Sequence, residues 1–422
     1  MSMNRKEVWS WMFYDFGNSA FATTIMVAVL PVFYKTVAAK NLEEGLALSY
    51  WGYTQSAALF IVAVLAPFLG AIADYSGSKK KMLLSLAFMG ILASCALALV
   101  SEGNYIMASL LTIVGTVGFS GANVFYDAFL PEIAPKDKID QISSKGFGFG
   151  YVGGGILLVI NMLMISKWDL FFSSKTAATQ VTFITVGLWW LVFTLPLLRN
   201  VKERKPAMET YPGNIVLIGL GRIRHTFRDI RKYKILLTFL IAYWLYNDGI
   251  STIMKMATIY GSSIGIGTND LILALVITQF IGIPCTFFIG WIAGKIGPKQ
   301  TLTMILVVYT FIVCFGYFMT TALHFYLLAA VVGLVQGGAQ ALSRSIFSSM
   351  IPANKHAEFF GFYNISGKLA AIVGPFVFAL TNQLFHSERI GILSLILFFV
   401  MGMFLLSRID IDKGRRDVEE AL

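Results

Sequence analysis

Residues 70–81 read Gly70-Ala-Ile-Ala-Asp74-Tyr-Ser-Gly77-Ser-Lys79-Lys-Lys81, a short polar and basic stretch between two long apolar segments. A related stretch, Gly290-Trp-Ile-Ala-Gly294-Lys-Ile-Gly297-Pro-Lys299, follows another apolar segment 220 residues later. Self-similarity at a fixed offset indicates that one structural unit occurs twice. The sequence therefore predicts a duplicated protein whose two halves share one plan.

Further repeats support the duplication. At an offset of 232, Tyr14-Asp15-Phe16-Gly17-Asn18-Ser19 aligns with Tyr246-Asn247-Asp248-Gly249-Ile250-Ser251. The two aspartates are one residue apart in this alignment, a step of about 100° around a helix. We therefore do not expect the two carboxylates to face the same way. Three more pairs match at an offset of 221: Pro131 and Pro352, Gly146 and Gly367, and Val152-Gly153 and Val373-Gly374.

The composition places the chain in the membrane class. Of its 422 residues 57% are hydrophobic and only 13% are charged, and the mean hydropathy is +0.72. Soluble domains carry about 25% charged residues. The net charge of +10 does not indicate nucleic acid, because the basic residues cluster in the short gaps between apolar runs. We predict an all-α integral membrane protein that passes the bilayer many times.

A helix needs about 20 apolar residues to cross a bilayer. The chain contains twelve runs of this kind, which we interpret as six spans in each half. They cover 9–36, 49–73, 82–100, 106–129, 147–165, 179–198, 235–259, 270–293, 301–320, 324–350, 361–384 and 389–407.

Charge predicts the orientation of these spans. With both termini in the cytoplasm, 27 of the 33 Lys and Arg residues fall on the cytoplasmic side, as the positive-inside rule requires. The sequence thus predicts an N-terminal bundle at 1–199, a cytoplasmic linker at 200–234 and a C-terminal bundle at 235–422. The linker alternates apolar and basic residues at helical spacing, which predicts an amphipathic helix on the membrane surface.

The stretch 70–81 also resembles the signature loop of the major facilitator superfamily, at the place where that family has it. In the second copy Gly294 stands where the first has Asp74. The resemblance covers nearly the whole chain and implies two six-helix bundles that rock around a central cavity. For Asp74, Lys79 and Lys80 it implies a gating role, in which the acid accepts hydrogen bonds from helix N-terminal amides.

Longer motifs narrow the resemblance. Residues 13–19, 336–345 and 358–364 read FYDFGNS, QGGAQALSRS and EFFGFYN. They resemble the bacterial branch of the vacuole-effluxer-like facilitators, once catalogued as an unknown major facilitator family. Fungal relatives are associated with amino-acid efflux from the vacuole, so the resemblance implies transport.

The buried acids are the first candidate site residues. A charge in bilayer hydrocarbon costs roughly 3 kcal/mol by insertion assays. A charged residue is therefore retained there mainly where it has a function or an interaction partner. Asp15 and Asp248 could bind a proton, a cation or a substrate ammonium, or could only order the bundle. Asn18 lies one turn beyond Asp15 on the same face. Lys255 could bind a carboxylate, contact another helix or extend its charged end to the membrane surface. Asn247, next to Asp248, is a further binding candidate.

Two other spans supply polar residues. Gln336, Gln340 and Arg344 form a stripe along one helix face, because they are four residues apart. The glutamines are predicted to line a cavity, whereas Arg344 could bind a carboxylate or close a cytoplasmic gate. The fourth span adds Asn123 and Tyr126 as binding candidates. Its last candidate, Asp127, lies near the cytoplasmic end, where gating fits better.

Other chemistries find no support. Gly148-Phe-Gly150-Tyr-Val-Gly153 has the glycine pattern of dinucleotide folds, but it opens an apolar span with no preceding strand. Glycines at four-residue spacing indicate close helix packing instead, and this span lacks the Gly-Pro of some facilitator antiporters. No phosphate-binding loop is present, and the histidines and cysteines are scattered. We expect no cofactor, no metal and no enzymatic activity.

These observations predict a secondary active transporter for a small polar or zwitterionic, amino-acid-like solute. Protons could couple through Asp15 or Asp248, since desolvation makes a carboxylate easier to protonate. Expected partners are the solute, the bilayer and possible coupling protons, with one chain sufficient for function. The expected place is the bacterial inner membrane, with efflux as the expected direction. Export of lipophilic or amphiphilic compounds, a non-transporting receptor on the same scaffold and a channel are the alternatives.

Overall fold

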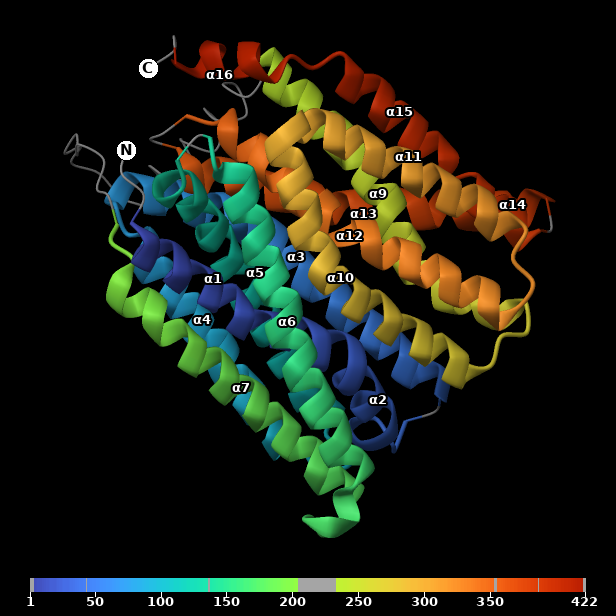
Figure 1. Ribbon diagram of the computed structural model, residues 1–422. Coiled ribbons are helices and arrows are strands. Elements are labelled where there is room, and N and C mark those ends of the chain that lie inside the picture. The colour runs from blue at the N-terminus through green and yellow to red at the C-terminus, as the bar shows by residue number, and fades with distance from the viewer. Residues whose placement is uncertain are drawn as a thin grey trace. The chain divides into compact units, whose positions relative to one another are not determined.

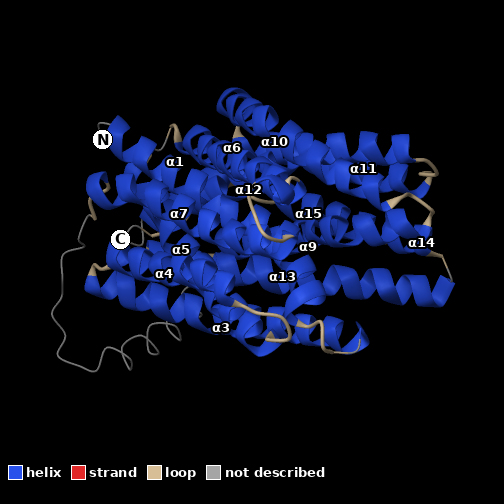
Figure 2. Ribbon diagram, turned by 90° about the horizontal axis from the view of Figure 1, so that it is seen from below, coloured by secondary structure: helices blue, strands red, loops and turns tan. Residues whose placement is uncertain are grey.

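The computed structural model describes residues 4–42, 44–135, 137–203, 233–352, 355–385 and 387–419. These residues form helices joined by short turns, and no strand occurs among them (Figure 2). The amphipathic helix predicted within 200–234 falls almost entirely outside the described residues.

Contacts divide the chain into two compact units. The first unit contains Met1–Ile133 and Phe149–Leu220, and the second contains Ala134–Gly148 and Gly221–Leu422. The division falls inside helix α6 (Ile139–Ser166), whose first turns belong to the second unit. The two bundles predicted from the sequence, with boundaries at 199 and 235, stay a prediction.

The first half of the chain forms six long helical crossings (Figure 1). The first crossing is composite, because α1 continues into π-helical turns before a short α-helix. The elements are α1 (Arg5–Ala20), η1 (Phe21–Val29), α2 (Leu30–Phe33), η2 (Tyr34–Ala38), α3 (Glu44–Ser76), α4 (Lys79–Ala96), η3 (Leu97–Leu99), α5 (Tyr105–Ile133), α6, η4 (Trp168–Leu170) and α7 (Lys175–Asn200).

The second half repeats the plan, and its last crossing is broken into two pieces. A short amphipathic helix, α16, follows the last crossing. The elements are α9 (Lys234–Ser263), α10 (Thr268–Ile296), α11 (Pro298–Tyr317), α12 (Ala322–Ser349), α13 (His356–Phe385), α14 (Glu388–Leu393), α15 (Ile396–Ser407) and α16 (Ile411–Glu419).

Each of the twelve predicted spans corresponds to one of these crossings, so the predicted helical architecture is confirmed. Within the described residues, ten helices are both long and apolar enough to cross a membrane. The spans predicted at 235–259 and 361–384 correspond to α9 and α13, each 30 residues long. Large apolar side chains such as Phe60, Leu99 and Phe311 are more than half exposed, as expected for side chains that face lipid.

Small residues bring helices of the first unit together. A Cβ atom on Gly118 of α5 would lie 2.5 Å from the backbone nitrogen of Gly90 on α4. A Cβ atom on Gly90 would lie 2.5 Å from the ring of Trp190 on α7. Without a hydrophobic driving force between helices in lipid, such close approach supplies much of the attraction. The packing of α4 between α5 and α7 therefore depends on glycine.

Candidate functional site

The polar cluster of the first unit centres on α1. The Asp15 side chain is only 8% exposed, and its Oδ1 atom accepts a hydrogen bond from the Ser19 hydroxyl at 3.3 Å. Asn18 is buried on the same helix. Asn18 and Ser19 follow Asp15 by three and four residues, about one helical turn, which is why they lie close to the acid.

Helix α6 approaches this cluster through glycine. A Cβ atom on Gly150 would lie 2.6 Å from the Ser19 Oγ atom and 3.2 Å from the Asp15 Oδ1 atom. One turn later, the Thr23 hydroxyl donates to the Gly154 carbonyl at 3.3 Å. The glycine-rich start of the fifth crossing thus packs against the acid-bearing face of α1.

Helix α5 contributes an amide and an aromatic ring. The Asn18 Nδ2 atom donates to the Asn123 Oδ1 atom at 2.6 Å. The Tyr126 ring stacks on Trp11 with centroids 4.3 Å apart, and the Trp11 indole donates to the Tyr126 carbonyl at 2.8 Å. Tyr14, which is within electrostatic range of Asp15, packs on the same tyrosine ring. The structure therefore brings Asp15, Asn18 and Asn123 into one region, while the Tyr126 ring is buried in an aromatic stack.

The corresponding cluster of the second unit is built differently. Asp248 is 2% exposed, and its Oδ2 atom accepts from the backbone N–H of Gly374 in α13 at 2.8 Å. The Asn247 amide donates to the Gly367 carbonyl at 3.2 Å, also in α13. Both predicted residues of α9 therefore contact backbone groups of one neighbouring helix.

The close packing of α9 on α13 repeats that of α1 on α6. A Cβ atom on Gly153 would overlap the Phe16 carbonyl oxygen, and one on Gly374 would lie 3.1 Å from the Asp248 carbonyl oxygen. The repeat offsets of 221 and 232 match these same partners, Gly153 with Gly374 and Phe16 with Asp248. The one-residue step between the two acids is therefore consistent with the packing.

Arg344 is buried among residues at the start of α6, all within the second unit. Its exposed fraction is 2%, and its Nε and Nη2 atoms donate to the Ser143 hydroxyl and carbonyl at 2.9 and 2.8 Å. The guanidinium carbon lies 4.1 Å from the centre of the Phe147 ring. Ser143 thus accepts from two nitrogens of the guanidinium, and both interpretations of Arg344, gating and carboxylate binding, stay predictions. Gln336 and Gln340 are half-buried on the same helix.

Lys79, at the end of the stretch 70–81, forms a buried ion pair with α5. Lys79 Nζ lies 2.5 Å from a Glu132 oxygen, and the two side chains are 4% and 9% exposed. The Glu203 carboxylate accepts from the backbone N–H groups of Lys79 and Lys80, and Lys80 Nζ donates to the Val201 carbonyl at 2.8 Å. Asp127 is buried at the end of α5.

Glu203 is a contact that sequence reasoning missed. From the sequence we expected Asp74 to accept hydrogen bonds from the helix N-terminal amides here. The side chains of Asp74 and Lys255 are not among those that the structure describes. Glu203 caps α4 in this way, from 124 residues away in the chain. Burial raises the pKa of the Glu203 carboxyl, and the hydrogen bonds from the Lys79 and Lys80 amides oppose that shift.

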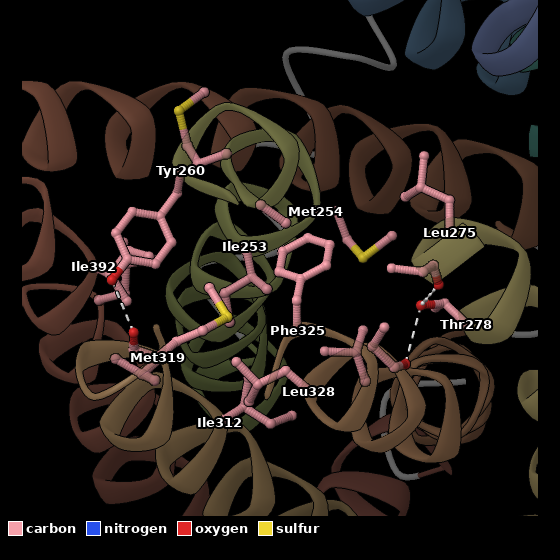
Figure 3. A pocket seen from close by; sticks show the side chains of 18 residues that line it. Ile253, Met254, Tyr260, Leu275, Thr278, Ile312, Met319, Phe325, Leu328 and Ile392 are labelled. Carbon is pink, nitrogen blue, oxygen red and sulfur yellow. Dashed lines mark hydrogen bonds between the residues drawn. The ribbon is translucent and has the colours of Figure 1, made fainter. Parts of the chain in front are cut away.

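The second unit also holds an apolar cavity of about 80 Å³, which lies among α9, α10, α11, α12 and the start of the last crossing. Figure 3 shows Met254, Met319 and Phe325 around it, and a hydrogen bond from the Thr278 hydroxyl to the Ala329 carbonyl, 3.0 Å long, at its edge. The cavity lining is almost entirely hydrocarbon and sulfur. Across the described part of the chain, no group of His, Cys, Asp and Glu side chains could hold a metal ion.

Comparison with solved structures identifies the fold. The chain superimposes on the proton:xylose symporter XylE with a TM-score of 0.69 at 15% identity, covering 96% of this chain and 94% of that one. It superimposes on the human organic anion transporter MFSD10 with a TM-score of 0.71 at 14% identity, covering 95% and 99%. Both are major facilitator transporters, so the protein has the major facilitator fold, with twelve crossings in two halves.

Sequence comparison narrows the class. Residues 46–419 match the family model "Vacuole effluxer Atg22 like", and the chain belongs to that family. The MFS-type transporter YxiO of Bacillus subtilis (strain 168) is 39% identical over 94% of this chain and 93% of its own. Autophagy-related protein 22 of Saccharomyces cerevisiae (strain ATCC 204508 / S288c) is 26% identical over 87% and 79%. The Bacillus relative is named as an MFS-type transporter and the family as vacuole effluxers, so this protein is a major facilitator transporter and not an enzyme, as the sequence predicted.

Proposed function

We propose that this transporter moves a small zwitterionic, amino-acid-like solute across the bacterial cytoplasmic membrane by alternating access. The observation that carries the proposal is the cluster of Asp15 and Asn18, which are buried, with the half-buried Asn123. A carboxylate and two amides supply an acceptor for an ammonium group together with neutral donors and acceptors. The family's description as vacuole effluxers supports export as the direction.

Asp15 is the candidate proton carrier. A carboxyl group buried in a bilayer is a functional candidate by default, and Asp15 contacts a hydroxyl that can donate to the ionised form or accept from the protonated form. A neighbour of the same fold is described as a proton:xylose symporter, which shows that proton coupling is compatible with this architecture. Both termini are proposed to be cytoplasmic, because most basic residues then lie inside.

The test is uptake into proteoliposomes of a radiolabelled mixture of neutral L-amino acids, with and without a pH gradient. We expect Asp15→Asn to abolish the stimulation by the gradient and to retain uptake driven by the solute's own gradient. Ser19→Ala, which removes only the hydroxyl neighbour, serves as the matched control and should change the stimulation less than threefold. Full stimulation in Asp15→Asn would refute proton coupling through this residue.

The apolar cavity supports a second candidate, export of a lipophilic compound. Methionine side chains adapt to irregular apolar ligands, and Met254, Met256 and Met319 all line the cavity. Ala329→Phe should fill the cavity, since Ala329 also lines it. If lipophilic export is the function, this variant should lose efflux of a fluorescent lipophilic cation from intact cells. Under the amino-acid proposal, uptake of amino acids should survive the substitution.

A further inference from the structure

Helix α13 has an acceptor from outside the helix and a proline at two consecutive residues. An N–H inside an α-helix ordinarily donates to the carbonyl four residues earlier. The N–H of Gly374 also finds an acceptor on a neighbouring helix, because it donates to the Asp248 carboxylate of α9 at 2.8 Å. The next residue, Pro375, has no N–H to donate and lies inside the same helix.

Only glycine permits this contact. A Cβ atom at position 374 would overlap the Thr252 hydroxyl and lie 2.8 Å from the Asp248 Oδ1 atom. The Thr252 hydroxyl in turn donates to the Asp248 carbonyl at 2.7 Å, which orders α9 at the same level. Asp248 and Thr252 are both buried. The carboxylate therefore reaches the backbone of α13 because no side chain stands between the two helices.

The first half has the same packing without the same chemistry. Gly153 approaches α1 at Phe16, whose ring offers no hydrogen-bond acceptor, and the residue after Gly153 is Gly154 rather than proline. The fifth crossing lacks a Gly-Pro pair, whereas the eleventh has one, Gly374-Pro375, at the point where Asp248 contacts it. The contact is therefore particular to the second half.

We propose that Asp248 is a positioning residue that holds α13 at a hinge formed by Gly374 and Pro375. Sharp bends in helices occur at proline and where a side chain inserts into the ladder, and both features coincide here. Pro375 offers no N–H to the carbonyl four residues earlier, which weakens the helix at this point. The Asp248 oxygen gives the Gly374 N–H an acceptor outside the helix, so α13 can bend here without leaving that donor unpaired in the bilayer. Asp248 and Asp15 thus have different tasks, hinge support and solute or proton binding. The proposal rests on the proposed function only where the hinge is said to move during transport.

The first experiment needs no transport. Amide hydrogen exchange of the α13 segment around Gly374 is measured by mass spectrometry in the full-length protein in nanodiscs. Asp248→Leu removes the acceptor and should speed exchange there at least tenfold. Asp248→Asn keeps an oxygen acceptor at the same place and should stay within threefold of the wild type. Thr252→Val, the control, loses only the bond to the Asp248 carbonyl and should also leave exchange unchanged.

A second variant covers the case in which Asp248→Leu does not fold. Gly374→Ala leaves the acid intact but forces the two helices apart, and it should give the same fast exchange. Fast exchange in Asp248→Asn, or unchanged exchange in both Asp248→Leu and Gly374→Ala, would overturn the proposal.

The second experiment asks whether the hinge serves transport. Pro375→Ala restores a donor for a regular ladder and should slow uptake of radiolabelled neutral L-amino acids at least tenfold without changing the half-saturation concentration. Asp248→Asn should retain the stimulation of uptake by a pH gradient, which a proton carrier at this residue would lose. Unchanged uptake in Pro375→Ala would overturn the hinge's part in transport. Absence of uptake in the wild type would instead refute the proposed function, and the exchange results would stand separately.

Discussion

The side-chain amide of Asn18 donates to the side-chain oxygen of Asn123 across 2.6 Å, and this bond joins α1 to α5 within the first unit. Both residues were candidates from the sequence, on two predicted spans, and they are 105 residues apart in the chain. Asn18 is buried one turn beyond Asp15. Its bond to Asn123 therefore holds the Asn18 side chain in place beside the acid.

A double-mutant cycle should measure this bond. Asn18→Leu and Asn123→Leu each remove one partner, and the double variant removes both. We expect a coupling free energy of about 1 kcal/mol, the size found for side-chain hydrogen bonds between membrane helices. Reversible unfolding in mixed micelles gives the four free energies. A coupling near zero would mean that the two amides do not interact in the folded protein.

The buried ion pair should be sensitive to the loss of one partner. Lys79→Met leaves the Glu132 charge buried, and such changes cost about 3–5 kcal/mol. Lys79→Met combined with Glu132→Leu removes both charges and should regain most of that stability. Thermal unfolding of the three variants checks this. Equal melting temperatures for the single and double variants would contradict it.

Glu203 predicts a pH dependence with a definite sign. Because burial raises its pKa, the folded protein binds this proton more tightly than the unfolded chain does. The contribution to stability is therefore fully present below the usual value of about 4.5 and is lost as pH rises through the raised pKa. Melting temperatures of wild type and Glu203→Gln across this range provide the test, and only the wild type should show the decline. If the melting temperatures of the two proteins changed in parallel with pH, Glu203 would not be the cause of the decline.

The glycine contact between α4 and α5 predicts a steric effect. Gly118→Ala places a Cβ atom 2.5 Å from the Gly90 nitrogen, a backbone atom that cannot rotate away. We expect a loss of about 1–3 kcal/mol, as for other overpacked sites. Gly316→Ala is the matched control, because its nearest neighbour would be the Ile392 Cγ2 atom at 3.6 Å, an ordinary contact. Similar melting temperatures for the two variants would argue against the close approach.

The sequence was sufficient for the architecture because a bilayer imposes a length and an apolarity on every crossing, and both can be read along the chain. It also indicated that Asn18 shares a helix face with Asp15, since that relation is local. The contacts of Glu203 with α4 and of Asp248 with Gly374 could not be predicted. Each joins residues more than 120 positions apart. Neither an acid that follows a helix nor a Gly-Pro pair indicates in the sequence which distant residue it will contact. The Gly374-Pro375 pair was nevertheless visible in the sequence and could have been compared with Asp248.

The wide turns of the first crossing have an evolutionary consequence. A π-helical turn takes up an additional residue without lengthening the helix by a full α-helical step, and η1 contains nine residues in such turns. A codon gained in this stretch can therefore be absorbed locally while both ends of the crossing stay at their depths in the bilayer. The repeats are offset by 232 at residues 14–19 and by 220 at residues 70–79, so the first half has twelve additional residues between these motifs. An alignment of the two gene halves should therefore allow gaps within Phe21–Val29 as well as in the loop that follows.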